Sequence, residues 1–111
     1  MKDLSVVELD KLMSEGKSLF ILDVREAEEL AISKLANSFH VPLMELEDRV
    51  LDITSEIQKL NPDYIIALCR GGSRSEMAAH FLESRGIKNI HNLVGGINEY
   101  AKRIDNTLKV Y

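Results

Sequence analysis

The stretch YIIALCRGGSRS, residues 64–75, decides how this chain folds. An unbroken apolar run reaches the only cysteine, Cys69, and the chain then passes through glycines, arginines and serines. A second unbroken apolar run, Leu19–Leu22, ends at Asp23. Apolar runs without alternation are typical of strands buried on both faces, as the strands of parallel sheets are. The two runs therefore predict a parallel sheet.

Helical patterns separate these strands along the chain. Ser5 and Glu8 have the spacing of a capping box, and helical periodicity continues from there to Gly16. Further helices are expected over residues 24–30, 43–60, 75–85 and 97–104, and further strands over residues 39–41 and 87–94. Alternating strand and helix signals predict an α/β fold with a mainly parallel central sheet. A chain of 111 residues is long enough for one core, so we expect a single domain, residues 1–111.

Composition excludes several classes of function. Eighteen acidic and 14 basic residues give a net charge of −4, which argues against nucleic-acid and anionic-membrane binding. The apolar runs are far shorter than the roughly 20 residues of a membrane span, and residues 1–5 show no signal peptide. One cysteine excludes an internal disulfide, a two-cysteine redox motif and a cysteine-based zinc cluster. It fits a reducing compartment, so we expect a cytoplasmic protein without metal or organic cofactor.

The chemistry is expected at the carboxyl ends of the two apolar strands, where open parallel sheets bind ligands. Glycines after Cys69 allow the main chain to curl with its amides turned inward, and the following helix start adds free amides and a positive dipole. Arg70 and Arg74 add formal charge. The pattern predicts an electropositive cup with the thiol at its floor. Such surroundings favour the thiolate, so Cys69 is a candidate nucleophile.

Plainer interpretations exist for each of these residues. A lone cysteine after an apolar strand is often only a small buried hydrophobe. The arginines can be solvated, the glycines can simply close a turn, and Asp23 can hold loop amides or a neighbouring arginine. The three histidines lack metal-ligand spacing and receive no catalytic role; they are His40, His80 and His91.

Taken together, these residues resemble the single-domain rhodanese (sulfurtransferase) family. The resemblance begins at LDVRE, residues 22–26, continues through Glu29-Leu30 and Val41-Pro42, and includes CRGGSRS, residues 69–75. It extends over the residues Ala78-Ala79, Leu82, Gly86, Asn89-Ile90, Leu93 and Gly95-Gly96-Ile97. The sequence departs from the family over residues 33–37, where a Gly-His-Ile-Pro-Gly-like turn is usual, and at Tyr100, where tryptophan is usual. The changes near Lys34 bear on partner choice, and neither departure touches the loop.

The resemblance implies a rhodanese-like sheet with helices on both faces, and sulfur transfer by double displacement. Cys69 would take the outer sulfur of thiosulfate or a persulfide and pass it to a thiol, cyanide or a sulfur-carrier protein. The substrate-binding residues it implies are Arg70, Gly71, Gly72, Ser73, Arg74 and Ser75. Asp23 and Arg25 would support the loop from behind, and small domains of this kind are monomers or weak dimers.

Two other functions compete with sulfur transfer. Phosphatases and arsenate reductases also place a cysteine and an arginine in a catalytic loop, but with Cys-x5-Arg spacing. Here the spacing from Cys69 to Arg74 is Cys-x4-Arg, which makes a loop that suits one sulfur atom better than a phosphate. The second competitor is a non-catalytic rhodanese-like module that binds a protein and carries or senses sulfur.

Overall fold

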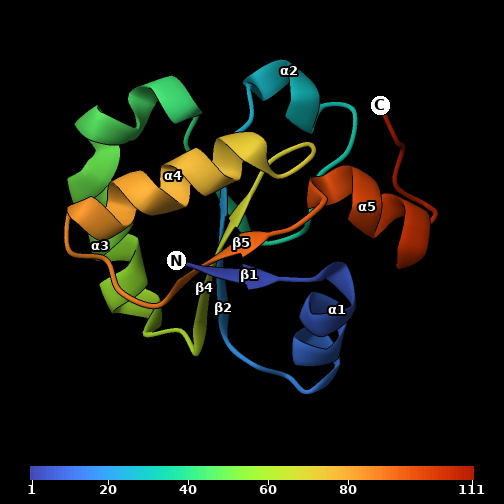
Figure 1. Cartoon of the computed structure of the whole chain (residues 1–111), viewed down its shortest axis with the longest axis horizontal. Coiled ribbons are helices and arrows are strands. Elements are labelled where there is room, and N and C mark those ends of the chain that lie inside the picture. The colour runs from blue at the N-terminus through green and yellow to red at the C-terminus, as the bar shows by residue number, and fades with distance from the viewer.

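A five-stranded parallel sheet in the order β1-β5-β4-β2-β3 forms the centre of the computed structural model, which describes residues 1–111 (Figure 1). The strands are β1 (Lys2–Leu4), β2 (Leu19–Asp23), β3 (Ser38–His40), β4 (Tyr64–Leu68) and β5 (Ile90–Leu93). The helices are α1 (Val6–Ser14), α2 (Ala27–Leu30), α3 (Leu46–Leu60), α4 (Ser73–Ser84) and α5 (Gly96–Arg103), with a 3-10 turn at Leu43–Glu45. The α/β fold and the parallel sheet are confirmed.

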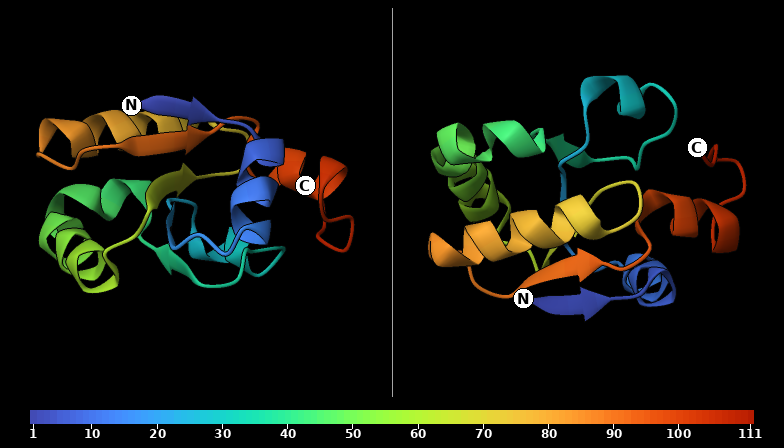
Figure 2. Two further views of the ribbon diagram at one scale, coloured as in Figure 1. Left: turned by 90° about the horizontal axis from the view of Figure 1, so that it is seen from below. Right: turned by 45° about the horizontal axis from the view of Figure 1, so that its top comes forward.

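Helices cover both faces of the sheet, as Figures 1 and 2 show. On one face α3 and α4 pack on a core that includes Phe20, Ile53 and Leu82. On the other face α1 and α5 pack on a second core that includes Leu9 and Ile66. The strands of the middle of the sheet are therefore buried on both sides, which explains their unbroken apolar sequences. None of the helices combines the length and apolar character that crossing a bilayer requires.

Local sequence signals fix several boundaries. The Ser5 hydroxyl accepts from the Glu8 amide at 3.0 Å, and the Glu8 carboxylate accepts from the Ser5 amide at 2.9 Å, so the predicted capping box starts α1. Helix α4 starts at Ser73, two residues before the predicted start, because Gly72 takes a positive φ of 111° and serves as its N-cap. The predicted strand 87–94 shortens to Ile90–Leu93.

Strand β1 was not predicted from the sequence. It has three residues, lies at the edge of the sheet and pairs only with β5, where Lys2 faces His91. A segment this short offers too few positions for an alternating pattern to show.

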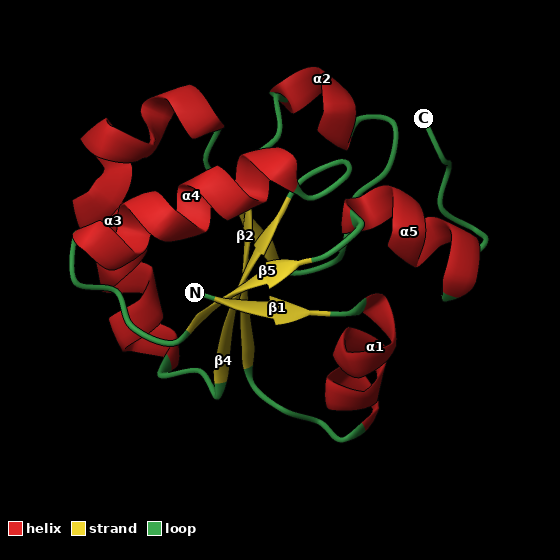
Figure 3. Ribbon diagram, viewed as in Figure 1, coloured by secondary structure: helices red, strands yellow, loops and turns green.

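The topology brings the ends of β2 and β4 together. These strands are neighbours in register, with Asp23 opposite Leu68, so Asp23 and Cys69 emerge at the same edge of the sheet. The sequence predicted this meeting point. The loop from Cys69 to Gly72 then turns into α4, and α2 faces that loop across the edge (Figure 3).

Candidate active site around Cys69

Cys69 lies directly after β4 and is buried, with 1% of its surface exposed. Its Sγ accepts a hydrogen bond from the Gly72 main-chain N–H at 3.1 Å and lies 3.2 Å from the Ser75 Oγ. Cys69 also contributes to the core under α3 and α4. The buried-hydrophobe interpretation is thus right about burial, but it leaves out the two polar groups that face the sulfur.

The Ser75 hydroxyl connects the sulfur to a buried amide that the sequence analysis missed. Ser75 Oγ lies 2.5 Å from Asn92 Oδ1 and 3.1 Å from the Gly72 carbonyl oxygen, and Asn92 Nδ2 donates to the same carbonyl at 3.1 Å. A serine has one hydroxyl proton and two lone pairs. Ser75 can therefore accept from the Cys69 thiol while donating to Asn92, or donate to the thiolate. The signal in the sequence was an asparagine inside an otherwise buried strand, where an amide needs partners.

The start of α5 holds the loop from behind. The amides of Ile97 and Asn98 donate to the carbonyl oxygens of Cys69 and Arg70 at 2.9 and 3.2 Å. Gly96 permits this approach: a Cβ placed on it would lie 2.2 Å from the Arg70 carbonyl oxygen, and its φ is +63°. The loop's carbonyls are thus directed toward α5. The amides of Ser73 and Arg74 in the first turn of α4 have no acceptor within the chain.

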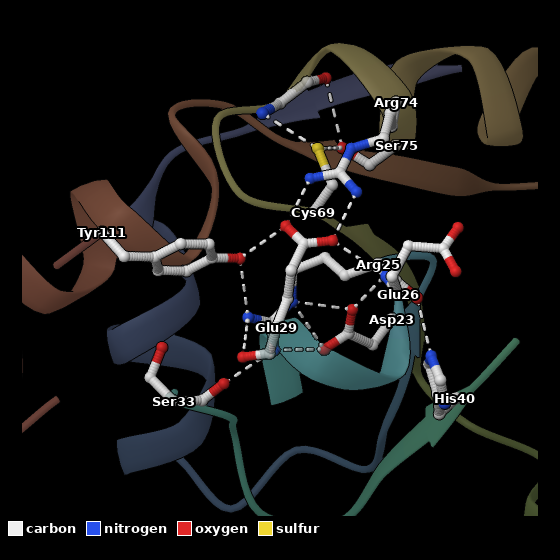
Figure 4. A network of polar contacts seen from close by, with 11 residues as sticks. Asp23, Arg25, Glu26, Glu29, Ser33, His40, Cys69, Arg74, Ser75 and Tyr111 are labelled. Carbon is white, nitrogen blue, oxygen red and sulfur yellow. Dashed lines mark hydrogen bonds and ion pairs between the residues drawn. The ribbon is translucent and has the colours of Figure 1, made fainter. Parts of the chain in front are cut away.

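Arg74 reaches from α4 to α2 and pairs with Glu29. Its two terminal nitrogens donate to the two Glu29 carboxylate oxygens at 2.7 and 2.8 Å (Figure 4). These hydrogen bonds are the largest cause that lowers the pKa of Glu29, to about 2. The same bonds are the largest cause that raises the pKa of Arg74. The sequence placed Glu29 only within the family pattern; its pairing with a loop 45 residues away was not predicted.

Asp23 and Arg25 form a fully buried ion pair below this bridge. Arg25 Nη2 donates to Asp23 Oδ2 at 2.8 Å, and both side chains have no exposed surface. Burial acts to lower the pKa of Arg25, but hydrogen bonds to Asp23 and Tyr111 outweigh it and raise that pKa. Arg25 also donates to the Ser33 and Glu29 carbonyls, so the pair fixes the segment that carries α2. The Arg25 carbonyl lies 2.6 Å from His40 Nε2.

The remaining loop residues lie at the rim. Gly71, Ser73 and Arg70 are exposed, and the Ser73 hydroxyl forms no hydrogen bond within the chain. The Arg70 guanidinium lies over the ring of Tyr111, 5.0 Å from its centroid, and pairs with no Asp or Glu side chain. The cup is therefore less electropositive than the sequence suggested. Glu29 offsets the charge of Arg74, and Glu76 adds a negative charge in the first turn of α4. The remaining positive charge comes from Arg70 and the N-terminus of α4.

Comparison with known proteins then decides the family. A family model described as "Rhodanese-like domain" matches residues 5–103, which include the complete Cys69 loop and both of its supports, Glu29 and Asn92. The chain belongs to the rhodanese-like domain family. The family resemblance predicted from the sequence is confirmed.

Individual rhodanese-like relatives agree with this assignment. The adenylyltransferase and sulfurtransferase MOCS3-2 of Zea mays is 28% identical over 105 residues, which are 94% of this chain and 22% of that protein. The putative sulfur carrier protein YrkF of Bacillus subtilis is 31% identical over 103 residues, 93% of this chain and 52% of that protein. A rhodanese-like domain protein from Staphylococcus aureus has a TM-score of 0.79 and 27% identity, with 100% of this chain and 99% of that chain covered.

The chain thus spans about half or less of the curated relatives it matches, and those relatives include proteins named for sulfur transfer and sulfur carriage. Within the rhodanese-like domain, the geometry places the Ser75 hydroxyl and the Gly72 main-chain N–H against the Cys69 sulfur. Two carboxylates behind the loop are engaged in ion pairs, since Arg74 holds Glu29 and Arg25 holds Asp23.

Proposed function

We propose that this rhodanese-like chain is a sulfurtransferase that carries sulfane sulfur as a persulfide on Cys69. The single observation that carries the proposal is the main-chain N–H of Gly72, which donates to the Cys69 sulfur at 3.1 Å. A main-chain donor fixed in this way stabilises negative charge on sulfur without any rearrangement at the moment of reaction. Ser75, 3.2 Å from the same atom, donates when the sulfur is ionised.

In the first half-reaction the Cys69 thiolate attacks the outer sulfur of thiosulfate or of a persulfide. A sulfur–sulfur bond to Cys69 forms, the donor's sulfur–sulfur bond breaks, and sulfite or a thiolate leaves with the electron pair. Both leaving groups depart as anions, so no general acid is required. This agrees with a site in which Asp23 and Glu29 are both engaged in ion pairs.

In the second half-reaction an acceptor attacks the terminal sulfur of the Cys69 persulfide. A thiol, cyanide or a sulfur-carrier protein takes the sulfur, and Cys69 is released as the thiolate. Arg70, the rim cation that pairs with no Asp or Glu side chain, is the residue we assign to anionic donors. Gly71, Gly72, Ser73 and Ser75 form the remainder of the binding loop, while Arg74 braces it against Glu29.

The geometry disfavours phosphate chemistry. A phosphatase of this kind needs its loop arginine free to bind two phosphate oxygens. Arg74 already uses both terminal nitrogens on Glu29. An aryl phosphate should therefore give no Cys69-dependent turnover.

The test is a cyanolysis assay with thiosulfate and, separately, with glutathione persulfide. We expect thiocyanate formation with at least one donor, parallel lines in double-reciprocal plots as ping-pong kinetics requires, and complete loss in Cys69→Ser. Failure with both donors and with a persulfidated cysteine desulfurase would overturn the proposal in favour of a module that only binds or senses sulfur.

A further inference from the structure

Tyr111 joins the two arms of the Cys69 site from a distant part of the chain. Its hydroxyl donates to Glu29 Oε1 at 2.8 Å and accepts from Arg25 Nη1 at 3.0 Å (Figure 4). Glu29 in turn holds Arg74 with both carboxylate oxygens. One phenol thus links the buried Asp23–Arg25 pair to the bridge that braces the catalytic loop.

The rest of Tyr111 engages the rim cation. The Arg70 guanidinium lies 5.0 Å from the ring centroid, and Arg70 Nη2 donates to the Tyr111 main-chain oxygen. Asn98 fixes that main chain: its Nδ2 donates to the Tyr111 oxygen at 3.0 Å and its Oδ1 accepts from the Tyr111 amide at 3.1 Å. Tyr111 also packs against the core under α1 and α5. Tyr111 is therefore fixed in position, and the Arg70 guanidinium packs on its ring.

This anchoring matters because Arg70 has no other partner. It is exposed, pairs with no Asp or Glu side chain, and has a long side chain whose free rotation would spread its charge over many positions. An arginine over an aromatic face is held by attraction to the ring while it keeps its charge. A cation held at one place attracts an anionic donor more effectively than one that must first be ordered.

We propose that Tyr111 is a positioning residue for sulfur transfer: its ring and main chain hold Arg70 at the rim for an anionic donor, and its hydroxyl aligns the Glu29–Arg74 brace. The proposal deepens the proposed function and rests on it for its kinetic readout. The two roles use different parts of the side chain, so substitutions separate them.

Tyr111→Ala removes the ring and the hydroxyl and leaves the main-chain contact to Arg70, whereas Tyr111→Phe removes only the hydroxyl. For Tyr111→Ala we expect KM for thiosulfate to rise about two- to fivefold, the ratio that a cation–π contact at an exposed site corresponds to. KM for a neutral organic trisulfide donor should stay unchanged. Tyr111→Phe should keep the thiosulfate KM and lower kcat by about fivefold or more, the ratio for the two hydrogen bonds that the hydroxyl makes. Tyr64→Phe is the matched control, since Tyr64 lies at the opposite end of β4.

Coupling to Arg70 separates positioning from mere structural support. The double variant Arg70→Ala/Tyr111→Ala should have the thiosulfate KM of Arg70→Ala alone, because the tyrosine acts through that arginine. The proposal is overturned if Tyr111→Ala changes KM for both donors equally, or if it lowers only the unfolding temperature.

A readout that does not need sulfur transfer keeps this test distinct from the test of the proposed function. The ratio of Cys69 alkylation rates with anionic iodoacetate and neutral iodoacetamide reports the charge at the rim. We expect Arg70→Ala to lower this ratio most, Tyr111→Ala to lower it by a smaller amount because the charge of Arg70 remains, and Tyr64→Phe to leave it unchanged. If the wild-type chain transfers no sulfur and this pattern still holds, the proposed function fails while the positioning of Arg70 stands. An unchanged ratio in Tyr111→Ala would overturn the positioning role as well.

Discussion

Replacement of Gly96 by alanine tests whether α5 sets the shape of the Cys69 loop. A Cβ at this position would lie 2.2 Å from the Arg70 carbonyl oxygen and 2.6 Å from the Cys69 carbonyl oxygen. Relief of that overlap requires the loop to move by about 1 Å, given ordinary contact distances of about 3.5 Å. Such a shift breaks the hydrogen bonds from Ile97 and Asn98 to these two carbonyls.

The expected cost has two parts. An alanine at φ +63° costs about 1–2 kcal/mol for its left-handed backbone alone. The two lost hydrogen bonds add about 1 kcal/mol each. Gly86→Ala is a matched control, because Gly86 has φ +92° and a Cβ added there would meet no atom within 4 Å. We therefore expect Gly96→Ala to lower the free energy of unfolding by about 2 kcal/mol more than Gly86→Ala does.

Urea denaturation of the two variants measures this difference, which corresponds to about 1 M in the midpoint at an ordinary slope. Cyanolysis should be lost in Gly96→Ala and retained in Gly86→Ala, because only the first displaces the carbonyls that frame Cys69. Equal midpoints and equal activity in the two variants would refute the claim that α5 holds the loop.

Three further substitutions test the supports of the site. Glu29→Gln should lower stability at pH 7. The pKa of Glu29 in the folded state is lowered from 4.5 to about 2, so its stabilising effect is complete above pH 4.5 and fades as the pH falls toward 2. Over that range the difference in unfolding free energy between wild type and variant should close in denaturant titrations. A constant difference would contradict the pairing with Arg74. Asn92→Ala should cost about 1–3 kcal/mol and slow Cys69 loading, since the Gly72 carbonyl and the Ser75 hydroxyl lose a buried partner; an unchanged midpoint in urea would contradict this. Asp23→Asn should cost about 3–5 kcal/mol because it leaves the charge of Arg25 buried without compensation. The exposed-pair control Asp52→Asn should cost at most about 1 kcal/mol in the same melts, and equal losses would argue against a special role for burial.

Local patterns predicted the framework of the site. The apolar runs before Asp23 and Cys69 identified the central strands, and parallel pairing then required their carboxyl ends to meet. The glycines after Cys69 indicated a curled loop, and the Gly72 amide does face the sulfur. These features depend on residues that are close in sequence, or on the general geometry of parallel sheets.

The supports of the loop depend on pairings that no local pattern specifies. Glu29 meets Arg74 across 45 residues, and Tyr111 meets Glu29 across 82. The acidic cluster around Glu29 is equally typical of a solvated helix face, so its carboxylate could not be assigned to the loop. Asn92 carried a usable signal, because a polar side chain in a buried strand requires partners. The positive charge predicted around Cys69 was too high because the pairing of Glu29 with Arg74 was not predicted.

The most direct test of the account is intact-protein mass spectrometry after exposure to thiosulfate or glutathione persulfide, followed by peptide mapping. We expect a gain of one sulfur atom, located on Cys69, reversed by cyanide and absent in Cys69→Ser. A protein that gains no sulfur from either donor, or gains it equally in Cys69→Ser, would contradict the claim that this loop holds a sulfur-carrying cysteine.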